Sequence, residues 1–478
     1  MVVPVSSGRS RPVLFTAVQK RPLGIATHPS PSAEKLEIVE KLLEPNLGAI
    51  IDAYFHTINK CVPLLDEGSF RRQFKDHKEK ISPALLACLY AHMVVYCINS
   101  PPSASRTWPD GRFIWNLANE ALYSELHLSP GVSIITAILL NVGGRPTTSL
   151  IGNGILLSSA VSIAHSLGLN RNPLDWDIPT PEKHLRMKIW WALFVHDKWT
   201  SLAHGTPPRI AQSHQDVPPP TVQFLCHPDS TEKELQVASA FIALVGLTGV
   251  LNVSLQQIYN TEKHKSRSTL QIELALHAWV DSLVGVSRRI IVRGSNLDLP
   301  GASNLRLTYL SMKLLLDKIK LESAKQDSDC SEEQVINIYL QGRQSAEQIL
   351  SFTQDLQATQ LNDFWLSVGA FTYPSTVNFL LRHALETESS PSGLADTLSF
   401  QLARQFIEIL RLHKEHHGWD MGDVCLAQHG EIVDKVLANA AADNLCADDM
   451  FDLQDFLVQD ASILDQYFSG LWDPPQNL

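Results

Sequence analysis

The chain has 478 residues, of which 44% are hydrophobic and 19% are charged. These proportions are typical of a globular protein that buries a sizeable core, in about three domains or one large helical unit with tails. The net charge is −11, but residues 447–478 hold seven Asp and no Lys, Arg or Glu, which leaves 43 acidic against 39 basic residues in positions 1–446. A nearly neutral body excludes a broad basic surface for a phosphate backbone.

The N-terminal stretch predicts a disordered basic arm over residues 1–33. It contains no Asp or Glu, is rich in Pro and Ser, and lacks the uninterrupted apolar run of a secretory signal. Two charge-poor stretches, 146–170 and 235–260, are long enough to cross a bilayer, but polar residues interrupt both. We therefore expect buried helices and no membrane partner.

The seven cysteines are scattered and include no Cys-x-x-Cys pair. This predicts a reduced intracellular compartment, thiols that serve as small core residues, and no structural metal site or cofactor in this chain. The histidines within 413–417 lack the order of a zinc protease and are interpreted as a solvated helix end. No phosphate-binding loop or serine-hydrolase motif is visible, so an enzyme is not expected.

Apolar residues recur at helical spacing through most of the chain, without sustained strand alternation. The pattern predicts an all-α fold, a large multi-helix bundle over residues 34–442. The expected helices cover residues 36–43, 50–58, 83–98, 113–126, 132–140, 155–167, 183–202, 235–259, 269–294, 304–322, 333–357, 360–383, 395–416 and 430–442. No fixed-period repeat indicates a solenoid.

The helix over 183–202 has the clearest boundaries. Thr180-Pro181-Glu182 supplies an N-cap, a first-turn proline and an acidic residue, and the Gly205-Thr206-Pro207-Pro208 turn ends the helix. Apolar residues cover more than one face, so Trp190 and Trp191 are interpreted as core anchors rather than as the lining of an effector pocket. Arg186 and Asp197 lie about three turns apart, and each is expected to pair with another helix.

Residues 160–220 resemble the middle homology region of the fungal zinc-cluster transcription factors. In that region an apolar helix ends in a Leu-Gly-Leu-His-Arg turn, and a helix with paired Trp, a Gly-x-Pro turn and an Asp-Val-x-x-Pro stretch follow. The matching positions are Leu167, Gly168, Leu169, Arg171, Arg186, Trp190, Trp191, Leu193, Phe194, Asp197, Gly205, Pro207, Ile210, Asp216 and Val217. Asn170 replaces the usual His, and the stretch 197–202 is most similar to the nitrogen-catabolism co-activators. The resemblance covers residues 45–420.

The resemblance implies regulation of RNA polymerase II transcription in a fungal nucleus, with homodimers or heterodimers among zinc-cluster factors. The six-cysteine cluster that binds two zinc ions and reads DNA in this family is not in the sequence. Zinc is therefore expected only if such a cluster lies upstream of Met1, and DNA binding only through that cluster or a partner. Two alternatives stay open: an all-helical protein or enzyme that binds an apolar ligand, and a co-regulator scaffold without DNA binding.

Residues 447–478 alternate Asp with bulky apolar residues, which predicts an acidic activation segment. Mutual repulsion of the aspartates keeps the apolar side chains solvated, and the segment suits a groove on the transcription machinery or a co-activator. The alternative is a C-terminal helix docked on the body. The apolar residues assigned to this segment are Phe451, Leu453, Phe456, Leu457, Tyr467, Phe468, Leu471 and Trp472.

Overall fold

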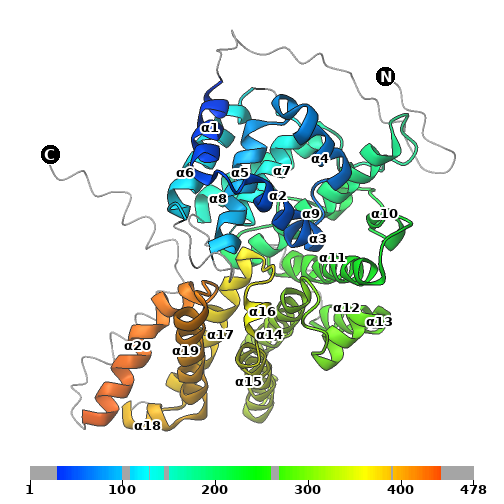
Figure 1. Ribbon diagram of the computed structural model, residues 1–478. Coiled ribbons are helices and arrows are strands. Elements are labelled where there is room, and N and C mark those ends of the chain that lie inside the picture. Colours follow the sequence, from blue (N-terminus) through cyan, green and yellow to red (C-terminus); the bar gives the residue numbers. More distant parts are fainter. Residues whose placement is uncertain are drawn as a thin grey trace. The chain divides into compact units, whose positions relative to one another are not determined.

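The computed structural model describes residues 30–98, 108–128, 130–144, 150–259, 269–388 and 391–442. Every regular element in these ranges is a helix, which confirms the predicted all-α fold (Figure 1). The predicted activation segment 447–478 and residues 1–29 of the predicted basic arm lie outside the described residues. The first helix begins at Pro31, inside the predicted arm, because the Ser30 side chain caps it by accepting the Ala33 N–H at 3.3 Å.

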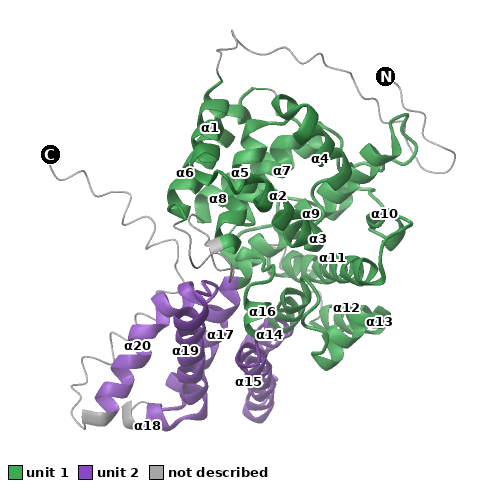
Figure 2. Cartoon of the chain, in the orientation of Figure 1, with its two compact units in different colours: residues 1–312, 357–369 green, residues 313–356, 370–478 purple. Residues whose placement is uncertain are grey.

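The chain divides into two compact units (Figure 2). Unit 1 comprises residues 1–312 and 357–369, and unit 2 comprises residues 313–356 and 370–478. The boundary falls inside helix α14 (Ala302–Gln326), whose sequence continues the helical pattern without a break. The sequence pattern predicts one helical domain over 34–442 and does not mark this division.

Unit 1 contains most of the helices. They are α1 (Pro31–Leu43), α2 (Leu47–His56), α3 (Ile58–Cys61), α4 (Glu67–Asp76), η1 (Lys78–Lys80), α5 (Pro83–Ile98), α6 (Gly111–Leu126), α7 (Val132–Val142), α8 (Leu150–Ser166), α9 (Thr180–His204), η3 (Gln212–His214), α10 (Val222–Leu225), α11 (Glu232–Ile258), α12 (Thr269–Ser282), α13 (Gly285–Arg288), η4 (Arg289–Arg293), the first part of α14, and α16 (Ala358–Leu361). The short helix η5 (Ser367–Phe371) crosses the unit boundary.

Two helices of unit 1 are enclosed by neighbours. Helix α5 packs against α1, α2, α6 and α7, and α11 packs against α3, α9, α12 and α13. Among the described residues, α11 is the one helix long and apolar enough to cross a bilayer, yet 72% of its most apolar window is buried inside the structure. The prediction of a buried helix over residues 235–259 is confirmed, and the helix runs from Glu232 to Ile258. Core helices of globular proteins can have the same apolar composition as a membrane span.

Unit 2 is built from α15 (Glu332–Gln354), α17 (Thr372–Thr387), α18 (Pro391–Asp396), α19 (Leu398–His417), α20 (Asp423–Ala442) and the second part of α14. Helices α17, α19 and α20 pack against one another in pairs, and α15 packs on α17 and α19. Helix α15 starts with a capping box in which Ser331 and Gln334 bind each other's backbone N–H groups.

Two of the predicted helices are interrupted. The stretch 269–294 breaks after Ser282, because Val284 is extended and Gly285 has a φ of +57°, which favours glycine. The stretch 360–383 is helical only from Thr372 apart from the short α16 and η5. Between them Trp365 is fully buried and donates its indole N–H to the Gln360 carbonyl oxygen at 3.0 Å, so tertiary burial wins over helical periodicity.

Candidate functional site

Helix α9 and the segments that flank it bring the signature residues of the sequence together. The helix begins at Thr180 itself, with Pro179 as the N-cap and no side-chain cap, so the predicted N-cap role of Thr180 is wrong. Proline at the start and Glu182 in the first turn are confirmed. The helix ends where expected, at Gly205, whose φ of +62° closes the last turn in the left-handed conformation.

The end of α8 is joined to the start of α9. Gly168 has a φ of +69°, and the N–H of the buried Leu169 returns to the Ala164 carbonyl at 2.8 Å, which confirms the predicted glycine cap. Arg186 donates to the Leu167 carbonyl at 3.1 Å and to Glu182 at 3.0 Å. Arg186 therefore satisfies a carbonyl at the end of α8, as expected for a contact with another helix.

Asp216 closes a second connection, between the turn after α8 and the segment after α9. Its carboxylate pairs with Arg171 at 3.0 Å and accepts the Asn172 N–H at 2.7 Å. Asn170, at the position where the family has His, donates its side-chain amide to the His214 carbonyl at 2.6 Å. Because these contacts are exposed, they contribute little to the free energy of unfolding. Their main effect is to fix the position of residues 214–216 against the turn after α8.

The paired tryptophans of α9 bind the segment that follows the helix, at Gln215 and Pro218. Trp190 and Trp191 are 0% and 7% exposed, which confirms the prediction of core anchors. The Trp190 indole N–H donates to the Gln215 side-chain oxygen, and that of Trp191 donates to the Pro218 carbonyl at 2.8 Å. Each ring thus buries a large apolar area while its N–H finds a partner.

The most unusual feature of α9 is a fully buried ion pair. Asp197 and Lys198 both have 0% exposed side chains, and their Oδ2 and Nζ atoms lie 2.9 Å apart. Asp197 also accepts the backbone N–H groups of Arg209 at 3.0 Å and Ile210 at 2.9 Å, and Lys198 donates to the Ile210 carbonyl. Burial lowers the pKa of Lys198, and the neighbouring Asp197 opposes that shift.

The expectation that Asp197 pairs with another helix is therefore wrong. Its partners are the adjacent Lys198 and the loop at 209–210. The turn at Gly205 and Pro207 folds the chain back along α9, which places two backbone donors beside a carboxylate that would otherwise be unsatisfied.

A buried histidine lies next to this pair along the helix. His196 is 4% exposed, and burial lowers its pKa to about 4, with a smaller contribution from the charge of His92 on α5. The His92 Nδ1 lies 2.7 Å from the Leu140 carbonyl oxygen. The low pKa keeps His196 neutral inside unit 1 at physiological pH.

Comparison with known proteins places these residues in a family. Residues 51–281 match the fungal specific transcription factor domain. The matched residues make up just under half of the chain, and the relatives that it resembles include fungal transcription regulators. All of the signature residues, from Leu167 to Val217, lie inside the matched range, which confirms the predicted resemblance to the fungal specific transcription factor domain.

Three relatives of this family illustrate the likeness. A transcriptional regulatory protein of Schizosaccharomyces pombe is 23% identical over 89% of this chain and 63% of its own length. The transcriptional activator protein DAL81 of Saccharomyces cerevisiae is 30% identical over 36% of this chain and 17% of its own length. The cutinase transcription factor 1 alpha of Fusarium vanettenii is 25% identical over 49% of this chain and 27% of its own length. The chain thus spans less than two thirds of each relative.

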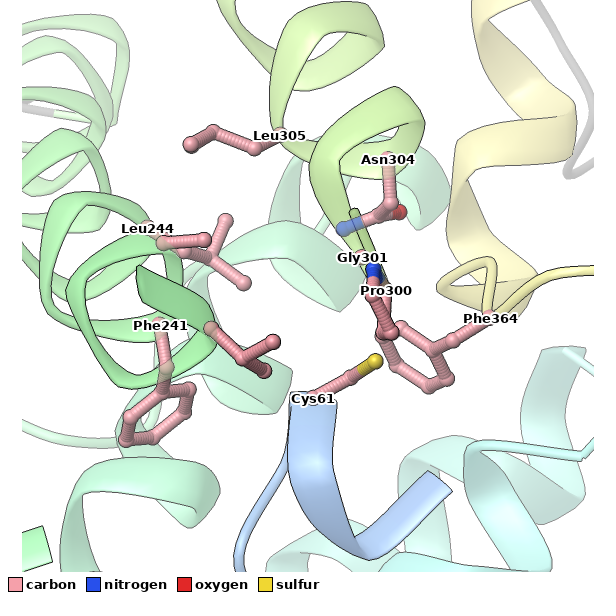
Figure 3. Close-up of a pocket in the computed structure, with 10 residues that line it drawn as sticks. Cys61, Phe241, Leu244, Pro300, Gly301, Asn304, Leu305 and Phe364 are labelled. Carbon is pink, nitrogen blue, oxygen red and sulfur yellow. The ribbon is translucent and has the colours of Figure 1, made fainter. Parts of the chain in front are cut away.

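One small cavity lies where helices α3 and α11 meet the start of α14. This cavity, which is lined by Cys61, Phe241, Gly301 and Phe364, among others, has a volume of about 10 Å³, enough for one water molecule (Figure 3). Burial raises the pKa of the Cys61 thiol, which keeps it protonated and inert. Within the described ranges, no group of three or more His, Cys, Asp or Glu side chains is placed to hold a metal ion.

Several residues on which the domain depends were not predicted from the sequence. Lys198, Gln215 and Arg209 supply partners to Asp197 and Trp190, and His196 is buried beside them. Lys198 could have been noticed, because a lysine within an apolar helix beside an aspartate is expected only when the two charges are paired. Gln215 and the backbone of Arg209 carry no such signal, since only the tertiary fold brings them to α9.

Proposed function

We propose that the chain regulates RNA polymerase II transcription in a fungus and acts as a helical regulatory body, not as a catalyst. The observation that carries the proposal is the match of residues 51–281 to the fungal specific transcription factor domain, in a chain whose relatives are named as transcription regulators and activators. The buried contacts of α9 support this function, because they hold a rigid framework from which tails and partners can work.

We assign recruitment of the transcription machinery or a co-activator to the segment 447–478. Its seven aspartates and bulky apolar residues suit a partner's groove. The test is to fuse the full chain, and separately residues 447–478, to an unrelated DNA-binding domain and to measure a reporter gene. Both fusions should activate, and replacement of Phe456, Phe468 and Trp472 by Ala should abolish the signal. A reporter that neither fusion changes would contradict the proposal.

We infer that this chain reaches specific DNA through a zinc cluster or a DNA-bound partner, in a homodimer or heterodimer of zinc-cluster factors. Residues 1–446 carry 43 acidic and 39 basic residues, so they supply little of the counter-ion release that drives DNA binding. A gel-shift assay with residues 1–478 at physiological salt should show weak binding without sequence preference. Tight, sequence-selective binding would contradict this assignment.

We place the protein in the nucleus, because its relatives are transcription regulators. A fluorescent fusion of the full chain, imaged in a fungal cell with a nuclear marker, tests this location. Signal confined outside the nucleus under every growth condition tried would contradict it.

A further inference from the structure

One lysine of unit 2 has a hydroxyl group as its hydrogen-bond partner and, among the described residues, no carboxylate. Lys318 lies on the part of α14 that belongs to unit 2, and its Nζ donates to the Ser375 Oγ of α17 at 2.9 Å. Lys318 is half-buried and Ser375 is exposed, so the Nζ atom lies at the edge of the surface. The fold thus holds this charge in place without neutralising it.

A second lysine of α14 is paired with a carboxylate. Lys325 lies about two turns after Lys318 on the same side of the helix, and its ammonium is 2.8 Å from Glu386 on α17. Asp317, beside Lys318 in the sequence, accepts the Ser345 hydroxyl of α15 at 2.6 Å instead. The two lysines therefore bridge the same pair of helices with different partners, and Lys325 serves as an internal reference for Lys318.

Another positive charge lies close to Lys318. Arg382 is exposed on α17, about two turns after Ser375 and on the same side of that helix. Burial of Lys318 lowers the pKa of its ammonium from the ordinary 10.5 to about 8, and the charge of Arg382 contributes to the shift. Both effects favour the uncharged amine, and both result from the contact that Lys318 makes with α17.

This pKa changes the chemistry that Lys318 offers near neutral pH. At about pH 7.4, about one fifth of the molecules carry a free amine at this position, against about 0.1% for a lysine with the ordinary pKa. The free amine is a nucleophile, whereas the ammonium is not, and the proximity of another cation activates lysine nucleophiles in enzymes. Lys318 therefore combines a partly free amine with a position at the surface.

We propose that Lys318 is an acylation site that takes its acyl group from a thioester. A thioester fits because it acylates a free amine near neutral pH without further activation. The amine nitrogen attacks the carbonyl carbon of the thioester, the N–C bond forms and the C–S bond breaks. The nitrogen loses one proton to the departing thiolate, so the products are an uncharged amide on Lys318 and a free thiol.

The modified side chain also fits its surroundings. The amide carries no charge, so acylation removes the repulsion between Lys318 and Arg382, and the amide N–H can still donate to Ser375. At Lys325 the same reaction would break the ion pair with Glu386. Acylation is thus expected to disturb unit 2 less at Lys318 than at Lys325. Neither the reaction nor its effect on unit 2 depends on a role in transcription.

Mass spectrometry of the full chain incubated with acetyl-coenzyme A at the same pH tests the assignment. The fraction of free amine favours Lys318 over an ordinary lysine by about 200-fold, and the lower basicity of its nitrogen offsets part of this advantage. Lys318 should therefore be acetylated at least about tenfold faster than Lys325. In concentrated urea, which removes the fold, the two rates should become equal.

A pair of arginine variants tests the physical cause. Arg382→Gln removes the neighbouring charge, which raises the pKa of Lys318, and it should slow the acetylation of Lys318 about twofold or more. The matched control Arg404→Gln, on α19, removes an exposed arginine that is paired with Glu408 and should leave the rate at Lys318 unchanged. Thermal melting followed by circular dichroism should show that both variants fold, since both arginines are exposed.

Equal acetylation rates at Lys318 and Lys325 in the folded wild-type chain would overturn the inference. This comparison needs no variant, so it decides the matter even if a substitution disturbs the fold. A rate at Lys318 that stays the same in urea would also overturn it, because the reactivity would then come from the local sequence and not from the contact with α17. An equal effect of Arg382→Gln and Arg404→Gln would contradict the role assigned to Arg382.

Discussion

Two charged regions of unit 1 differ in how the fold treats their charges. On α9, the side chains of Asp197 and Lys198 are fully buried, and they bind each other and the backbone of Ile210. Around η4, three exposed arginines face solvent without a carboxylate partner in the described residues. A buried charge needs a partner because its removal from water is costly, whereas water solvates an exposed charge without one. The first region is therefore expected to contribute far more to the stability of the fold than the second.

Trp191→Asp should cause the largest loss of stability, and it tests whether this part of α9 belongs to the core. It places a charge without a partner at a site that is 7% exposed, which costs several kcal/mol against a typical total stability of about 5–15 kcal/mol. Circular dichroism should show the loss of cooperative melting. The control Phe113→Asp, at a position 49% exposed on α6, should melt like the wild type. A normal melting curve for Trp191→Asp would show that this part of α9 does not belong to the core.

Asp197→Asn tests the buried pair itself. The substitution leaves the Lys198 ammonium without its counter-charge inside unit 1, and we expect a loss of about 3–5 kcal/mol in the free energy of unfolding. Asp52→Asn removes a carboxylate from an exposed pair with Arg71 and should cost less than about 1 kcal/mol. Denaturant titrations of both variants measure the difference. Equal losses would mean that burial does not distinguish the two pairs.

Acid should weaken unit 1 through His196. Its pKa is lowered from the ordinary 6.5 to about 4, so the unfolded chain binds a proton at a pH where the folded chain does not. Stability is therefore full above pH 6.5 and falls as the pH drops toward 4, by up to about 3 kcal/mol from this residue. Denaturant midpoints between pH 7 and 4.5 should fall less steeply in His196→Gln. An unchanged slope would assign the acid sensitivity to other groups, such as His204.

The three exposed arginines around η4 should show the smallest effect on stability. Arg288→Gln, Arg289→Gln and Arg293→Gln remove exposed charges that have no ion-pair partner in the described chain, and each should change the free energy of unfolding by no more than about 0.5 kcal/mol. Thermal melting of the single variants checks this expectation. A loss above about 2 kcal/mol would mean that these arginines stabilise the π-helical turn, and the contrast with α9 would disappear.

Local signals explain what the sequence predicted well. Gly168 and Gly205 both adopt the positive φ that a helix end favours, and the flanking residues confirm the boundaries that they mark. The burial of Trp190 and Trp191 followed from apolar residues around most of α9. Such features depend on neighbours within a few residues, so no knowledge of the tertiary fold is needed to anticipate them.

Long-range contacts explain what the sequence did not predict. His413 was expected at a solvated helix end, but it is 3% exposed, and its Nε2 lies 2.8 Å from the Thr353 carbonyl oxygen. Trp419, after the turn at Gly418, packs against the imidazole with ring centres 5.6 Å apart. The partners of Asp197 were missed for the same reason, since a loop that returns along its helix leaves no periodic pattern.

Unit 1 is formed by two separate stretches of the chain, residues 1–312 and 357–369, and the ribosome synthesises part of unit 2 between them. Residues 357–369 belong to unit 1, where the Leu366 N–H binds Asn304 at 2.9 Å and Ser367 donates to the Val142 carbonyl at 3.0 Å. Residues 313–356 of unit 2 are synthesised before them, which takes several seconds at about 5–20 residues per second. Unit 1 therefore cannot be completed until residues 313–356 of unit 2 have been synthesised. A chain truncated at residue 281, where the match to the family ends, would lack residues 357–369 of unit 1.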